Sequence, residues 1–113
     1  YAWLTSGEDI TVAMKYGFRL AVDVSHLAIQ SRLGLLSVSQ CRKIFDYDKI
    51  AEIHVSRSTG RSDAHMPLSL DGSDFGIQWA KEKLKAGTPV VLESYLHRLT
   101  TDERKQQLDV ILK

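Results

Sequence analysis

Residues 50–55 read Ile-Ala-Glu-Ile-His-Val, a short run rich in β-branched side chains that predicts a buried strand. Two similar apolar runs, residues 18–22 and 90–92, predict a strand before it and a strand after it. Helical patterns separate the three runs and also lie outside them. This alternation predicts an α/β domain whose sheet is parallel and whose crossovers are right-handed.

Four helices are predicted around these strands. The first starts at the hydroxyls of Thr5 and Ser6 and stops at Gly17, and the second covers residues 38–45. The third ends at Gly87, and Thr100 opens the last one with a capping-box pattern. The residues expected to face the core are Ile10, Ala13 and Met14; Val38, Cys41 and Phe45; Phe75, Trp79, Ala80 and Leu84; and Leu108, Ile111 and Leu112. No element is assigned to residues 24–37, and residues 56–72 are expected to form a polar loop.

The composition bounds the class of protein. The 113 residues are 43% hydrophobic with a net charge of +1, which suits one globular domain over residues 1–113 and gives no support for a charge-driven nucleic-acid partner. The single Cys41 excludes an intramolecular disulfide framework and a cysteine-rich zinc module. With no membrane-spanning run or signal-peptide pattern, we expect a cytoplasmic protein without a membrane partner.

Potential metal ligands gather where the predicted strands end. They are Asp23 and His26 after the first strand, His54 near the end of the second with Asp63 and His65 in its loop, and Glu93 after the third. Parallel α/β proteins build their sites at this edge of the sheet. Imidazole and carboxylate together suit zinc, iron or manganese, and six ligands exceed the needs of one tetrahedral ion. The sequence therefore predicts a metal centre that could hold more than one ion.

Each of these residues also has a simpler interpretation. Asp23 could cap a helix, and Asp63 and His65 could belong to a solvated loop. Arg57 and Arg61 are candidates for binding a substrate phosphate or carboxylate, although a solvated surface role explains them equally well. Cys41 and Trp79 are expected to serve packing, and His97 to lie in a loop or at a helix start.

The order of these motifs resembles the later half of the xylose-isomerase-like TIM barrels, the superfamily that includes endonuclease IV. The matching motifs are Asp23-x-x-His26, His54, Asp63-x-His65 and Leu92-Glu93. The resemblance implies that the chain forms the last three βα units of a (β/α)8 barrel. It also implies that His26, Asp63 and His65 share one ion, and that Asp23, His54 and Glu93 share another with a glutamate from an earlier strand.

Three branches of the superfamily stay open. Sugar isomerases share the Asp-x-x-His, His and Glu ligands but usually have Asp-x-x-Arg where this chain has Asp63-x-His65. Iron-dependent oxidases that modify peptides resemble the loop through Pro67 and the later Trp79, but tend to have Asn at the position of His26. The endonuclease branch matches all six ligands, yet the net charge gives no support for its DNA-contacting loops.

The function implied by the resemblance is metal-dependent chemistry on a sugar or a phosphodiester. A divalent ion, zinc first and manganese or iron as alternatives, would activate water or polarise a substrate oxygen, with Glu93 and His54 as the candidate catalytic residues. The ligands of the family's earlier strands have no counterpart before residue 18. We therefore expect a complementary N-terminal chain or a homo-oligomer, and a non-catalytic module that depends on a partner is the alternative.

Overall fold

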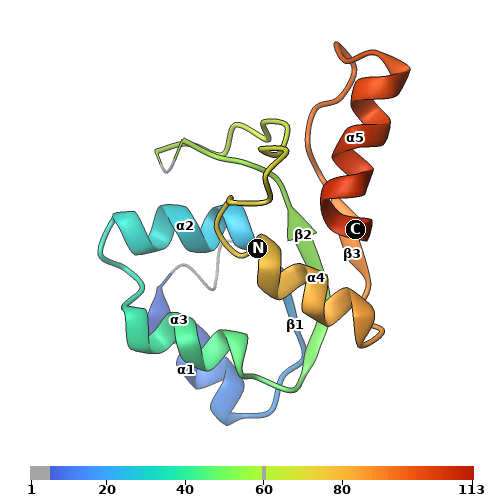
Figure 1. Ribbon diagram of the computed structural model, residues 1–113. Coiled ribbons are helices and arrows are strands. Elements are labelled where there is room, and N and C mark those ends of the chain that lie inside the picture. The colour runs from blue at the N-terminus through green and yellow to red at the C-terminus, as the bar shows by residue number, and fades with distance from the viewer. Residues whose placement is uncertain (1–5, 60) are drawn as a thin grey trace.

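The computed structural model describes residues 6–59 and 61–113 and shows an α/β arrangement around one small sheet (Figure 1). The elements follow in the order α1 (Gly7–Lys15), β1 (Leu20–Asp23), α2 (Val24–Arg32), α3 (Val38–Phe45), β2 (Ile50–Val55), α4 (Ile77–Lys85), β3 (Val90–Leu92) and α5 (Thr101–Leu112). The predicted α/β class is confirmed. The predicted bounds of α3, β2 and β3 are confirmed as well.

The sheet has three parallel strands in the order β1-β2-β3. Leu20 pairs with Ile50, but the next residue, Ala21, pairs with Glu52, so the register shifts by one residue at the start of β1. From there Ile53 and Val55 point to one face and are fully buried, while Glu52 and His54 point to the other and stay partly exposed. The alternation along β2 thus places these apolar and polar side chains on opposite faces of the strand.

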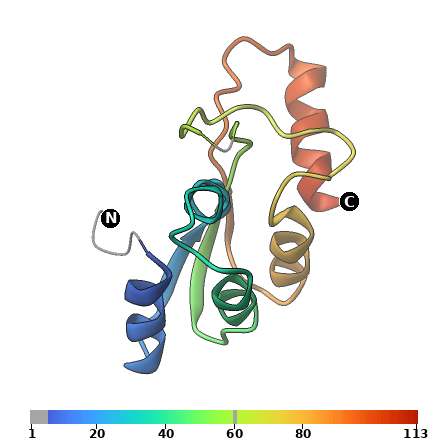
Figure 2. The ribbon, with the colours of Figure 1, turned by 90° about the vertical axis from the view of Figure 1, so that its left-hand side faces the viewer.

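Helices cover the apolar face of the sheet. Figure 2 shows α3 and α4 together on one side of the strands, and the core combines their inner residues with those of β1 and β2. Ile44 of α3 and Ile77 of α4 are almost fully buried there. On the opposite face Ala21 and Val91 are exposed. One face of the sheet therefore stabilises the fold, and the other remains accessible.

The structure adds one helix and corrects several expected positions. α2 occupies residues to which no element was assigned, because the side chain of Asp23 caps its first turn directly after β1. Phe18 is exposed, and the first strand starts two residues later than expected. Val38 and Phe75, which are expected to face the core, are exposed. Ala80 of α4 is buried as expected, and Ile77 is the other buried residue of that helix.

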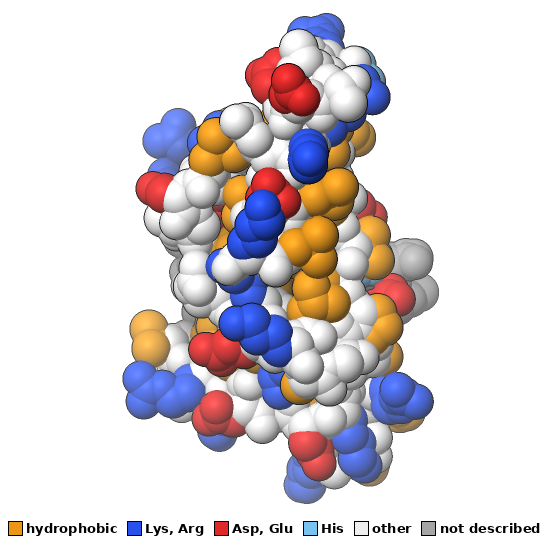
Figure 3. Space-filling model, turned by 45° about the vertical axis from the view of Figure 1, so that its right-hand side comes forward, with side chains coloured by type: hydrophobic (Ala, Val, Ile, Leu, Met, Phe, Trp, Pro, Cys, Tyr) orange, Lys and Arg blue, Asp and Glu red, His pale blue; other side chains and the backbone are white. Residues whose placement is uncertain are grey.

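The last helix turns a different face inward from the one expected. Leu108 and Leu112 are exposed, whereas Gln107, Val110 and Ile111 are buried. Figure 3, which brings the right-hand side of Figure 1 forward, shows hydrophobic side chains at the surface in a band beside Lys and Arg. The Gln107 amide explains why α5 turns this face inward. Its oxygen accepts from the backbone N–H of Leu68 at 2.6 Å, and its nitrogen donates to the carbonyl of Leu68 at 2.9 Å.

Other expectations are confirmed. Ile10 and Ala13 of α1 are buried, and Ser6 is the N-cap of that helix. Thr5 lies outside the described residues. Cys41 is buried in the core, and Trp79 packs on Phe45 at a ring distance of 4.7 Å while its indole N–H donates to the Phe45 carbonyl. Among the described residues, no helix is long and apolar enough to cross a membrane.

Candidate metal centre

Three potential ligands meet at the carboxyl ends of the three strands. Asp23 ends β1 and lies opposite His54 of β2 in the parallel register. Glu93 follows β3, and its backbone N–H donates to the carbonyl of Val55 at 2.9 Å. One potential ligand atom from each of Asp23, His54 and Glu93 lies within 4.8 Å of the other two. We call these three residues the strand-end triad.

Asp23 has a structural and a potential binding role at once. Its Oδ1 accepts hydrogen bonds from the backbone N–H groups of Ser25 at 2.8 Å and of His26 at 3.1 Å, so it caps α2. Its Oδ2 lies 3.9 Å from Nε2 of His26. One oxygen of this carboxylate therefore caps the helix, and the other lies at ion-pair distance from the imidazole of His26.

A buried pair of serines ties the start of α2 to the end of β2. The hydroxyl of Ser25 donates to the carbonyl of Ser56 at 2.8 Å, and the two hydroxyl oxygens are also 2.8 Å apart. Both residues are almost fully buried. Because α2 is anchored in this way, the position of His26 is set relative to the loop that carries Asp63 and His65.

A second group of ligands lies beside the strand-end triad. Oδ2 of Asp63 is 2.8 Å from Nε2 of His26 and 3.1 Å from Nε2 of His65. An antiparallel bridge between Arg57 and Met66 closes the base of the loop that carries Asp63 and His65. We call His26, Asp63 and His65 the loop triad. The distance of 3.9 Å between Asp23 and His26 connects the two triads, so the six predicted ligands lie in a chain of contacts. The ligand atoms that converge within 4.8 Å are those of the strand-end triad.

His65 adopts an unusual backbone conformation. Its φ of 47° lies in the left-handed region. This conformation is unfavourable in free energy for any residue that has a Cβ atom. The carbonyl of His65 accepts a hydrogen bond from the backbone N–H of Tyr95 at 2.8 Å, and the two rings lie 5.2 Å apart. Nδ1 of His65 is buried and has no hydrogen-bond partner among the described residues. The loop thus holds the imidazole with Nε2 toward Asp63.

The carboxylates determine the charge state of two histidines. Burial lowers the pKa of His26, but the hydrogen bond to Asp63 and the charges of Asp23, Asp63 and Glu93 outweigh it, and the pKa lies above its ordinary value. Burial likewise lowers the pKa of His54, and the carboxylates of Glu52 and Glu93 raise it further than burial lowers it. The site is therefore a place where positive charge is stabilised.

Sequence reasoning missed Glu52. Its Oε1 lies 2.8 Å from Nε2 of His54, while Nδ1 of His54 lies 3.3 Å from Oε2 of Glu93. The signal was present in the alternation along β2, because residues two apart in a strand share a face. His54 thus lies between two carboxylates.

The predicted substrate-binding arginines lie in or near the same loop. Nη1 of Arg57 donates to the hydroxyl of Ser69 at 3.3 Å, and Arg61 is exposed. His97 is exposed in the turn before α5, where its carbonyl accepts from Arg104. None of these contacts involves a residue of either triad.

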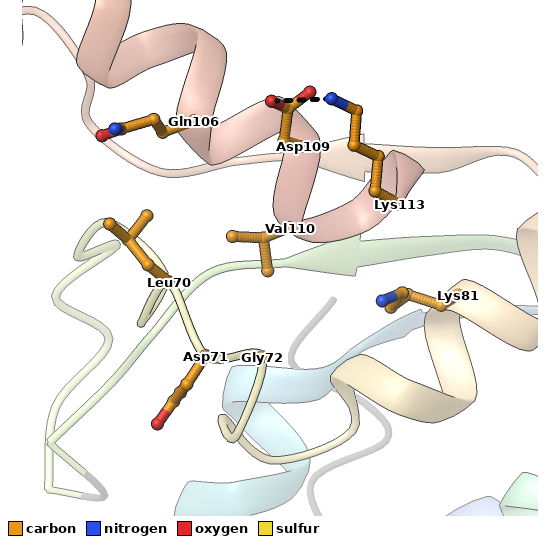
Figure 4. Close-up of a pocket in the computed structure, with 8 residues that line it drawn as sticks. All are labelled: Leu70, Asp71, Gly72, Lys81, Gln106, Asp109, Val110 and Lys113. Atoms are coloured by element: carbon orange, nitrogen blue, oxygen red, sulfur yellow. Dashed lines mark hydrogen bonds and ion pairs between the residues drawn. The ribbon is translucent and has the colours of Figure 1, made fainter.

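A hollow of about 340 Å³ lies away from the two triads, among the loop before α4, α4 itself and α5 (Figure 4). Its lining residues are Leu70, Asp71, Gly72, Lys81, Gln106, Asp109, Val110 and Lys113. Lys113 pairs with Asp109 at 3.4 Å, so one of the two lysine charges is balanced within the hollow. The hollow shares no residue with the ligand cluster.

Comparisons with models of known protein families, with curated proteins and with solved structures found no match to this chain.

Proposed function

We propose that this chain supplies the metal ligands of a metal-dependent enzyme related to the xylose-isomerase-like TIM barrels. The observation that carries the proposal is the strand-end triad, in which Asp23, His54 and Glu93 bring potential ligand atoms within 4.8 Å of one another. The bound ion would activate water or polarise a substrate oxygen, on a sugar or a phosphodiester. Glu93 and His54 are the candidate catalytic residues, and Arg57 and Arg61 the candidates for binding an anionic part of the substrate.

The donor set fits a divalent ion of intermediate softness. Two carboxylates and one imidazole form the strand-end triad, and one carboxylate and two imidazoles form the loop triad. Such mixed sets suit zinc, manganese or iron better than calcium or magnesium, which prefer oxygen alone. Zinc is the first candidate for the bound ion. Because Nε2 of His26 lies 3.9 Å from Oδ2 of Asp23, an ion held by the loop triad would neighbour one held by the strand-end triad, an arrangement that also suits an iron-dependent oxidase.

The sheet supports a partner for this chain. Among the described residues, β1 and β3 each pair on one side only, and parallel strands with free edges readily accept further strands. A complementary N-terminal chain or a second copy would cover these edges and could add ligands to the centre. In a TIM barrel such strands would come from the earlier βα units.

One observation favours the alternative of a non-catalytic module. His26 and His54 each lie 2.8 Å from a carboxylate oxygen, so both imidazoles have partners without any metal. In that case the cluster would be a set of structural ion pairs. Metal content separates the two proposals.

The test is a metal titration of the purified chain, with elemental analysis of protein prepared without chelator. We expect at least one equivalent of bound metal, and a loss of affinity of about 10-fold or more for Glu93→Gln, because a neutral amide is a poor ligand for a divalent ion. His97→Asn is the matched control and should bind like wild type. A stable chain that binds neither zinc, manganese nor iron would support the module.

Metal identity would also separate the branches of the superfamily. Three zinc ions would point to phosphodiester hydrolysis, and one manganese or magnesium ion to sugar isomerisation. Two or three iron ions would point to oxidation.

A further inference from the structure

Both ring nitrogens of His54 face carboxylates, but the two carboxylates come from different places. Nδ1 faces Glu93 at 3.3 Å, on the side of the strand-end triad. Nε2 faces Glu52 at 2.8 Å, and Glu52 belongs to neither triad. A ligating histidine commonly donates its second N–H to a carboxylate in this way.

The strand places Glu52 in this position. Glu52 and His54 are two residues apart on β2, so they share the accessible face, while Ile53 between them is fully buried against the helices. On the neighbouring strand Ala21 lies opposite Glu52. Alanine offers no polar group that could compete for the carboxylate, so the imidazole of His54 is the partner that the structure gives to Glu52.

We propose that Glu52 is a positioning residue, which accepts the Nε2–H of His54 and so leaves Nδ1 free to bind an ion shared with Asp23 and Glu93. A neutral imidazole carries its proton on one nitrogen only, and the acceptor at Nε2 decides which. The hydrogen bond also restricts rotation of the ring and makes Nδ1 a stronger donor. This inference rests on the proposed metal-binding function and adds a residue to it.

The test uses Zn²⁺ alone, titrated against the full chain in competition with a chromophoric chelator. Glu52→Ala should lower zinc affinity by about 10–100-fold, the usual effect of removing such a partner. Glu52→Gln keeps an acceptor oxygen and should retain most of the affinity. Glu82→Ala, on the exposed side of α4, is the control and should bind like wild type.

A second measurement reads the tautomer directly. Proton–nitrogen correlation spectra of the zinc-loaded wild type should show the proton of His54 on Nε2 and the metal on Nδ1. This measurement needs no variant, so it holds even where Glu52→Ala fails to fold.

The outcomes separate the two proposals. If wild type binds zinc and Glu52→Ala binds it equally well, or if the metal sits on Nε2, the positioning role is wrong and the metal site stands. If folded wild type binds no zinc, manganese or iron, the proposed function is wrong and the positioning role falls with it.

Discussion

Asp23 lies directly opposite His54 across the parallel strands β1 and β2, at the carboxyl end of the sheet. This pairing brings an acidic and an imidazole side chain from residues more than 30 positions apart onto the same face. Glu93 adds a second carboxylate from β3, with potential ligand atoms of all three within 4.8 Å. The strand-end triad therefore depends on the sheet register.

Because Asp23 caps α2 through one oxygen and faces the cluster through the other, its two roles can be separated. Asn caps helices as well as Asp does, whereas Ala loses about 0.5–2 kcal/mol. We expect Asp23→Asn to keep the unfolding free energy near that of wild type and to lose metal affinity. Asp23→Ala should lose both.

Metal titration and denaturant unfolding of the two variants check this prediction. If Asp23→Asn binds zinc like wild type, Asp23 is a helix cap and not a ligand.

The raised pKa values of His26 and His54 predict that metal affinity depends on pH. Each imidazole must release its proton before it can bind an ion, and neighbouring carboxylates hold that proton to a pH above the usual value of about 6.5. Zinc affinity should therefore rise between about pH 6 and pH 8, across the range in which histidine titrates. Zinc titrations at several pH values measure this rise in affinity, and titrations in two buffers record the protons released on binding.

The metal-free protein should show the opposite trend. A raised pKa in the folded state means that the stabilisation is fully present below the unfolded-state pKa and is lost as pH rises through the folded-state pKa. The contribution of His26 and His54 to the unfolding free energy should thus decline over the range in which zinc affinity increases. Denaturant unfolding of wild type and of the His26→Asn and His54→Asn variants at both ends of the range gives the contribution of each histidine to the unfolding free energy. A contribution that increases with pH would contradict the prediction.

The buried Gln107 predicts a site-specific loss of stability. Its amide satisfies the backbone N–H and carbonyl of Leu68, so Gln107→Ala leaves two buried polar groups without partners. We expect a loss of about 1–3 kcal/mol for each group that stays unsatisfied. Gln106→Ala, one residue earlier on the exposed side of α5, should change stability little. Equal melting temperatures for the two variants would show that the amide contributes nothing.

The left-handed conformation of His65 predicts a difference between two truncations. His65→Ala keeps the steric cost of φ 47°, which is about 1–2 kcal/mol for a residue with a Cβ, whereas His65→Gly relieves it. The glycine variant should therefore unfold at a higher denaturant concentration than the alanine variant. Both remove the imidazole and should weaken metal binding to the loop triad. A less stable glycine variant would show that His65 does not hold this backbone conformation in solution.

The sequence alone determined the class of fold and the set of candidate ligands. The strands over residues 50–55 and 90–92 and the helix over residues 38–45 follow from local runs and periodicity, which is information carried by neighbouring residues. The six candidate ligands could be named because parallel strands present their carboxyl ends at one edge of the sheet. Their place in the chain was enough to expect that they meet.

Tertiary structure decided the rest, because the deciding contacts join residues far apart in the chain. The face of α5 that turns inward depends on Gln107 reaching Leu68, and a polar residue in a helix does not reveal a backbone partner 39 positions away. The role of Glu52 depends on which face of β2 the helices leave open, and Ala21 lies opposite Glu52 on that exposed face. The two triads are connected because Asp23 caps α2 and also belongs to the strand-end triad. Periodicity indicates which residues share a face, and only packing and pairing determine what that face meets.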